Sequence, residues 1–170
     1  MTFGGFVIQT RRLGPGEKKR EKSDFAPSAV DILCIAGETL VGAVAGSDWV
    51  VITNFKNGTA IEGALPTVQK VPVASVEAPL IGCVHWQEGT KTVGKKLWVR
   101  VYGRHQYANT DGTTDVAAGD MLRGHNATSG AVETTTDKGT HVGFALADRT
   151  TNSIAGNDTW INNPQRIPLA

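Results

Sequence analysis

Residues 116–148 read VAAGDMLRGHNATSGAVETTTDKGTHVGFALAD, and this stretch decides the fold class. Glycine-centred turns divide it into three short strand patterns, of which the last, residues 140–147, is the clearest. Its alternation places Val142, Phe144 and Leu146 on one face and mostly small residues on the other. A thin face of this kind is typical of a strand that lies against another backbone. The stretch predicts part of a small barrel or sandwich.

The rest of the 170-residue chain follows the same pattern. Its 20 glycines and frequent threonines favour strands joined by tight turns over helices, and no apolar stripe of helical period exceeds about two turns. Alternating patterns predict strands at residues 30–35, 68–76 (an edge strand, because it contains Pro72), 80–86, 96–102 and 159–161, and a hairpin of residues 39–45 and 49–54 around 46–48. Residues 104–115 read as a polar loop. We therefore predict an all-β fold, a small β-barrel or sandwich of short antiparallel strands with an extended N-terminal arm.

The predicted arm spans residues 1–27 and the predicted β domain spans residues 28–170. Six basic residues stand against two acidic ones between positions 11 and 22, a net +4 that leaves −3 for the rest of a chain whose total is +1: Arg11, Arg12, Lys18, Lys19, Arg20 and Lys22. A basic segment on a mildly acidic body predicts an arm that meets an acidic surface or phosphates. The alternative is a solvated charge run. Because aromatics are not interleaved, we expect no specific nucleic-acid binding.

The two cysteines, Cys34 and Cys83, have no CxxC spacing, and we predict buried, unpaired thiols in a reducing compartment. The N-terminus has no apolar core of the kind found in secretory signals, and no run approaches 18 apolar residues. We therefore expect a soluble protein, without membrane contact, that is cytoplasmic at synthesis.

No strong catalytic or metal signature is present. Residues 89–96 match the first seven positions of a P-loop, but Lys96 stands where Ser or Thr should bind Mg²⁺, and a strand pattern follows where a helix should begin. His125 with Asp115 and Asp120 is the best candidate metal cluster, and it lacks a second histidine. We expect no enzymatic activity, no cofactor and no metal site.

Three segments of the C-terminal third resemble the capsid cement (head decoration) proteins of tailed phages. They are Ala118-Gly119-Asp120-Met121-Leu122, Gly130-Ala131-Val132 and His141-Val142-Gly143-Phe144-Ala145-Leu146. The family shows an A-G-D-x-hydrophobic strand opening, a G-x-hydrophobic hairpin and a hydrophobic-G-x-A-L strand in a small β-barrel. The basic arm and the proline-rich residues 65–79 depart from this pattern.

The resemblance implies a capsid cement subunit, a structural protein of the virion. Such a protein binds the outer surface of the head, stabilises the lattice of the major capsid protein, and is usually a homotrimer and sometimes a dimer. We expect docking through the six basic arm residues and through exposed aromatics chosen from Trp49, Trp98, Tyr102 and Trp160. Core packing is the alternative for those aromatics. The alternatives for the protein are another virion or tail component, or a small-ligand-binding β-barrel.

Overall fold

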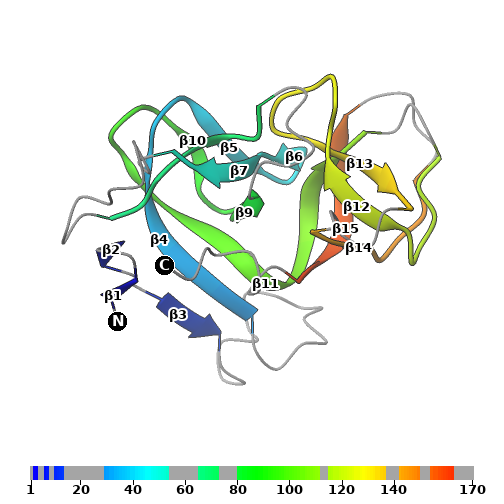
Figure 1. The fold of residues 1–170 in the computed structure, drawn as a ribbon, viewed down its shortest axis with the longest axis horizontal. Coiled ribbons are helices and arrows are strands. Elements are labelled where there is room, and N and C mark those ends of the chain that lie inside the picture. The colour runs from blue at the N-terminus through cyan, green and yellow to red at the C-terminus, as the bar shows by residue number, and fades with distance from the viewer. Residues whose placement is uncertain are drawn as a thin grey trace.

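The computed structural model of the chain describes residues 2–3, 6–7, 10–13, 29–53, 65–72, 80–111, 115–136, 142–149 and 154–162, and every regular element among them is a strand (Figure 1). The strands are β1 (Thr2–Phe3), β2 (Phe6–Val7), β3 (Thr10–Leu13), β4 (Ala29–Ala36), β5 (Leu40–Ala43), β6 (Gly46–Ser47), β7 (Trp49–Ile52), β8 (Thr67–Lys70), β9 (Leu80–Val84), β10 (Gly89–Lys91), β11 (Lys96–Thr110), β12 (Met121–Gly124), β13 (Val132–Thr135), β14 (Gly143–Ala145) and β15 (Ala155–Asn162). The predicted all-β class is confirmed. In the described segments no helix is present that could cross a membrane.

Thirteen strands form one sheet, ordered β13-β12-β14-β15-β11-β9-β7-β8-β4-β3, with β5, β6 and β10 beside this path. β4 also pairs with β11, so the pairings from β11 through β9, β7, β8 and β4 return to β11. Apolar side chains from these five strands and β5 form the first core: Ile32, Cys34, Ala36, Leu40, Val50, Val68, Ile81, Val84, Leu97, Val99 and Val101.

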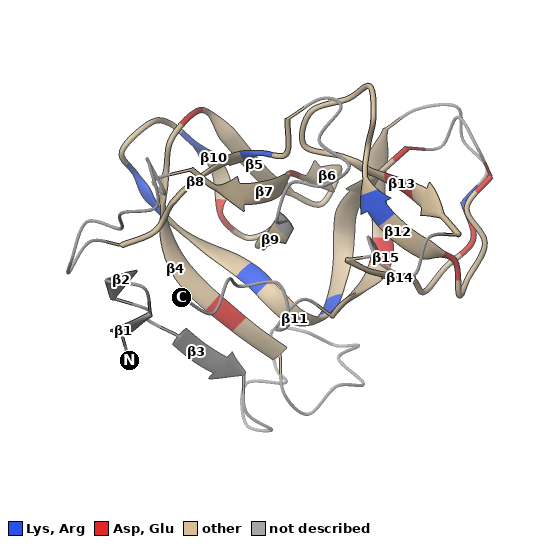
Figure 2. Cartoon of the chain, in the orientation of Figure 1, with Lys and Arg blue, Asp and Glu red and all other residues tan. Residues whose placement is uncertain are grey.

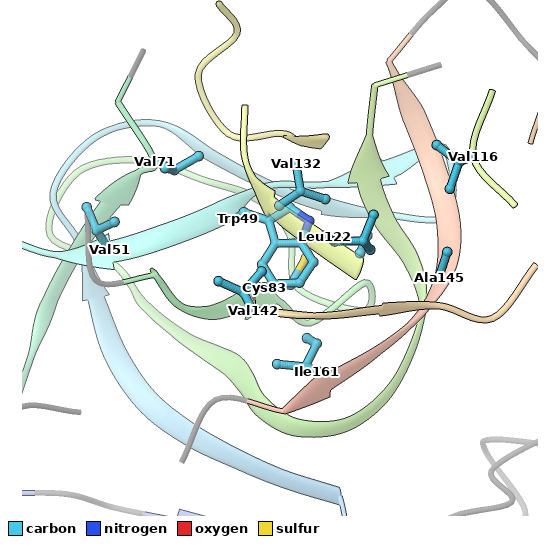
Figure 3. Close-up of a cluster of buried hydrophobic side chains, with 11 residues drawn as sticks. Trp49, Val51, Val71, Cys83, Val116, Leu122, Val132, Val142, Ala145 and Ile161 are labelled. Atoms are coloured by element: carbon cyan, nitrogen blue, oxygen red, sulfur yellow. The ribbon is translucent and has the colours of Figure 1, made fainter. Parts of the chain in front are cut away.

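A second circuit of strands shares β11. β13 bridges the end of β11 at Thr110↔Val132, so the pairings through β15, β14, β12 and β13 also return to β11. The second core is drawn in Figure 3 and contains Trp49, Val51, Val71, Cys83, Ala108, Val116, Leu122, Val132, Val142, Ala145 and Ile161. Because Trp49 and Cys83 come from β7 and β9, whose neighbouring residues Val50 and Val84 belong to the first core, these two strands are buried on both faces. The arrangement is sandwich-like.

Most predicted strands are found where the sequence placed them. Residues 30–35, 80–86, 96–102 and 159–161 lie in β4, β9, β11 and β15, with small differences at the ends.

The predicted loop at residues 104–115 is wrong for residues 104–110, which continue β11. β11 has register shifts between Arg100 and Tyr102 against β4 and between His105 and Ala108 against β15. Such bulges add a residue and break the two-residue alternation by which a strand is recognised in a sequence.

Two further predictions are corrected. β5 turns back at residues 44–45 to pair with β6, whereas β7 pairs with β8 and β9, so the predicted hairpin does not form. β8 lies between β7 and β4 and is no edge strand, because Pro72 comes after the strand has ended. Asn57-Gly58 is the strongest two-residue turn signal in the sequence, and it lies outside the described residues.

The stretch 116–148 supplies β12, β13 and β14, three adjacent strands in the order β13-β12-β14, and β14 continues onto β15. Gly143 lies on the predicted thin face, where a Cβ atom would stand 2.1 Å from the carbonyl oxygen of Trp160. The expected close packing against a backbone is confirmed at this position.

We expect Gly143→Ala to lower the free energy of unfolding by ~3 kcal/mol, because a side chain at this position must push β15 away. Urea unfolding followed by tryptophan fluorescence measures the loss. Gly89→Ala is the control: its Cβ meets no atom within 4 Å and only its positive φ (66°) opposes the change, so we expect about 1 kcal/mol. Equal losses in the two variants would contradict the steric explanation.

Candidate docking surfaces

Two of the six basic residues predicted to dock lie within the described chain. Arg11 and Arg12 are in β3, which pairs antiparallel with β4 so that Arg11 is opposite Asp31 and Arg12 is opposite Val30. Residues 10–13 of the predicted arm are therefore a strand of the main sheet. The other four predicted docking residues lie outside the described residues: Lys18, Lys19, Arg20 and Lys22.

A buried ion pair follows Arg11 in the same row of the sheet. Asp31 of β4 is opposite Arg100 of β11, and the Arg100 Nε donates to the Asp31 Oδ1 over 2.8 Å with both side chains fully buried. Figure 2 shows the pair as adjoining red and blue segments of β4 and β11. The alternation of residues 96–102 puts Leu97, Val99 and Val101 inside and predicts Arg100 on the outer face, and this prediction is wrong because Arg100 is fully buried. The available signal was Asp31, a carboxylate inside the apolar strand AVDILCIA.

Further groups surround the Arg100 guanidinium. Its Nη1 donates to the carbonyl oxygen of Arg104 over 2.5 Å, and its Cζ lies 5.3 Å from the centre of the Trp86 ring, which stacks on His85 at 4.2 Å. A buried charge is tolerated when it is paired and hydrogen-bonded. These contacts make Arg100 a structural residue.

We expect Arg100→Met to cost ~3–5 kcal/mol of folding free energy, because it leaves the Asp31 carboxylate buried without its guanidinium. The double variant Asp31→Leu/Arg100→Met should recover most of that loss, since no buried charge remains. Arg123→Met is the control: it breaks the partly exposed pair with Glu133 and should cost at most about 1 kcal/mol. A double variant less stable than Arg100→Met would contradict this reasoning.

His105 is fully buried in β11 beside this network. Its Nε2 lies 2.9 Å from the carbonyl oxygen of Val84, and its Nδ1 accepts from the Tyr107 amide over 3.2 Å, so the proton is on Nε2. Burial, and after it the charge of Arg100, lowers the pKa of His105 to about 3. The ring is therefore neutral in the folded protein at ordinary pH.

This depressed pKa predicts a loss of stability in mild acid. The unfolded chain binds a proton on His105 below pH 6.5 and the folded chain does not until about pH 3, so stability falls by ~1.4 kcal/mol for each pH unit across that window. Between pH 7 and pH 5 the wild type should lose about 2 kcal/mol more than His105→Gln, as measured by urea unfolding at each pH. The same pH dependence in both proteins would rule out His105 as the cause.

The four aromatics considered for docking divide into two groups. Trp49 is fully buried in the second core (Figure 3), so it is excluded from docking, and its Nε1 has no hydrogen-bond partner among the described residues. Trp98, Tyr102 and Trp160 are half-buried.

One face of the sheet carries an aromatic row, which we define as Met121, Phe144, Trp160 and Arg104. The register aligns these residues across β12, β14, β15 and β11, and each is half-buried. Tyr102 meets the Trp160 ring edge to face at 5.6 Å. The opposite face of the same strands packs into the second core. Aromatic, Met and Arg side chains are enriched at protein interfaces, so this row is a candidate docking surface.

Charged pairs flank the aromatic row. Arg104 donates two hydrogen bonds to the Asp158 carboxylate from Nε, at 2.8 Å and 3.0 Å, and a third from Nη2. Arg123 lies 2.8 Å from Glu133 on the neighbouring strand pair. The hydrogen bonds to Asp158 raise the pKa of Arg104. These internal pairs leave the face with little net charge, which suits an uncharged partner surface.

The residues that carry the family resemblance are parts of the framework. Asp120 accepts the Ala117 amide over 2.9 Å, and Gly119, whose φ is +97°, donates its amide to Ala145 over 2.8 Å. This turn joins the start of β12 to β14. Gly130 similarly donates to Val71 and accepts from Trp49, which ties the β12–β13 hairpin to β7.

His125, Asp115 and Asp120, the best candidate metal cluster in the sequence, do not form one. The His125 Nε2 lies 2.6 Å from Asp111, which the sequence analysis missed, while Asp120 binds a backbone amide. The His125 Nδ1 accepts the amides of Ala127 and Thr128 over 2.8 Å each, so the imidazole organises its own loop. Within the described ranges no group of three or more His, Cys, Asp or Glu could hold a metal ion.

The remaining chemical motifs are also structural. Residues 89–96 form β10, a turn and the first residue of β11, so a strand follows where a P-loop needs a helix. Cys34 and Cys83 are buried and free, as predicted, and burial raises the pKa of both thiols. Both are therefore protonated thiols at neutral pH, unsuited to nucleophilic chemistry.

Comparisons with known proteins give a structural likeness but no match in sequence. No protein-family model and no curated protein matches the sequence. The chain is similar to a solved structure of the head fiber gp8.5 N base of bacteriophage phi29, with a TM-score of 0.47 and 12% identity over 79% of this chain and 95% of that one.

Proposed function

We propose that the protein is a structural protein of a tailed-phage virion: a capsid cement subunit, without catalytic activity, that binds the outer surface of the head. Its partner is the major capsid protein, whose lattice it stabilises. One observation carries this proposal. The three segments that resemble the cement family lie together as β13-β12-β14, and their glycine turns and Asp120 hold these strands to β7, β14 and β15.

The packing suits a mechanical role. Two cores share β7, β9 and β11, so load on one circuit of strands is passed directly to the other through hydrogen-bonded strands. Close-packed protein interiors have low compressibility and transmit strain. A cement protein needs a stiff platform of this kind between neighbouring capsid subunits.

Two regions would bind the capsid. The basic residues 18–22 supply charge for an acidic surface, and the aromatic row supplies uncharged contact area. In a homotrimer, several weak contacts would add up through avidity. Contact with protein explains both regions together, whereas phosphate contact would explain only the basic one.

We expect neutralisation of the arm to abolish particle binding without unfolding the protein. The variant Lys18→Gln/Lys19→Gln/Arg20→Gln/Lys22→Gln leaves β3 intact, whereas a deletion up to residue 26 would also remove that strand from the sheet. Co-sedimentation with expanded, emptied heads of the phage that encodes the chain measures binding. We expect an affinity at least about tenfold weaker, a loss of 1.4 kcal/mol or more.

The matched control removes four positive charges elsewhere: Lys56→Gln, Lys91→Gln, Lys138→Gln and Arg166→Gln. It should bind as the wild type does, which separates a local contact from the effect of net charge. Binding by the arm variant equal to that of the control would refute docking through the arm. A wild-type protein that does not sediment with the heads would refute the cement function itself.

A further inference from the structure

Several exposed charged side chains form no ion pair with another described residue, and the cations and carboxylates among them gather at opposite ends of the longest axis of the molecule. Most charged side chains of the described chain are compensated locally, including Lys70 by Asp48, Lys91 by Glu88, Arg104 by Asp158 and Arg123 by Glu133. Figure 2 shows mostly blue segments around β10, beside one red segment, and mostly red segments in the loops around β12 and β14 at the opposite end of the view, beside one blue segment.

The basic end is the turn between β10 and β11, residues 92–96, which we call the basic tip. Lys95 and Lys96 are exposed and form no ion pair with a described residue, and Val93 between the strands is 66% exposed. The carboxylate nearest in sequence, Glu88, lies 3.1 Å from Lys91, and Glu38 accepts the Lys70 amide over 2.5 Å. The basic tip therefore offers two cations beside an exposed apolar side chain.

The opposite end offers the complement, and we call it the acidic end. Asp115 and Asp148 are exposed and Asp120 is half-buried, and none of the three forms an ion pair with a described residue. The Ala118 amide donates to Asp148 and joins the two loops, while the Ala117 amide donates to Asp120 within the first loop. Leu146, two residues before Asp148, is 42% exposed. Each end thus pairs one apolar side chain with charges of one sign.

We propose that the basic tip of one copy binds the acidic end of the next, in a head-to-tail contact between identical chains. Val93 meets Leu146 at its centre, and Lys95 and Lys96 face the three carboxylates. Opposite charges steer the encounter and fix its register, and the apolar contact excludes water. Because the two ends are different surfaces, the contact is heterologous: it closes into a ring if the rotation between copies divides a full turn, and otherwise it propagates.

This inference is independent of capsid binding. It names the surfaces of self-association, which the resemblance leaves open, and it requires no capsid for its test. A ring would also place the same face of every copy on the same side, so that several arms could reach one surface together.

The test is sedimentation velocity of the full chain over a range of concentrations at 0.05 M and 0.5 M salt. Wild type should form a discrete oligomer at low salt that weakens at high salt, since exposed pairs are screened. Variant A (Lys95→Glu/Lys96→Glu) and variant B (Asp115→Lys/Asp148→Lys) should each associate at least about tenfold more weakly. The chain that carries all four substitutions should regain association, because its two ends are again complementary. A mixture of A and B should form mixed oligomers.

The control Gln87→Glu/Ser129→Glu changes two exposed residues away from the two ends and should associate as wild type does. Circular dichroism checks that every variant folds. Three results would each overturn the proposal. The wild type could be monomeric, variants A and B could associate as strongly as the wild type, or the chain with all four substitutions could stay monomeric. If association of the wild type requires added Ca²⁺ or an added oligonucleotide, the acidic end or the basic tip serves that ligand, and the head-to-tail contact is wrong.

Discussion

β11 is the constraint on which the rest of the structure depends, because it is the one strand common to both circuits of pairing. Its first half pairs with β4 and β9, its second half pairs with β15, and its last residue bridges β13. A strand of fifteen residues can serve two cores only if it coils strongly, and its two register shifts supply the extra local twist. If β11 were straight or shorter, it could not border both cores.

The register around β11 is fixed by charge as well as by apolar packing. Asp31, Arg100 and Cys83 share one row on β4, β11 and β9, and the row continues into Trp49 on β7. A slip of one residue between β4 and β11 would leave a carboxylate and a guanidinium buried without each other. Each buried ion left without its partner would cost several kcal/mol. A slip that only placed one apolar side chain where another of similar size had been would cost less, because cores tolerate such substitutions. The ion pair thus selects one register among several that satisfy the apolar pattern.

The sequence predicted what depends on local alternation and missed what depends on distant partners. The all-β class, β4, β9, β15 and the thin face at Gly143 follow from a period of two and from glycine placement. The second half of β11 was missed because its bulges break that period and because His105 and Arg104 resemble loop residues. Arg100 was placed on the outer face and the position of Trp49 was left open, because their burial is decided by Asp31 and by β12–β15, which lie far away in the chain. Docking through the basic residues at positions 18–22 remains a prediction.

The division between framework and surface decides where functional differences reside. Every described residue of the resemblance with a defined contact holds strands together: Asp120 and Gly119 join β12 to β14, Gly130 joins the hairpin to β7, and Gly143 admits β15. Met121 and Phe144, in the aromatic row, and Asp120, in the acidic end, are members of this set that also reach a candidate docking surface. Other candidate contact residues lie at the margins of the resemblance segments or outside them. They are the basic tip, Leu146 and Asp148 of the acidic end, and residues 18–22. A resemblance made of turns and buried glycines can preserve a platform while the surfaces that select a partner change freely, since surface substitutions cost little folding free energy. If the proposals above hold, partner choice depends on the exposed ends, the aromatic row and the arm, and these are the regions in which related platforms should differ.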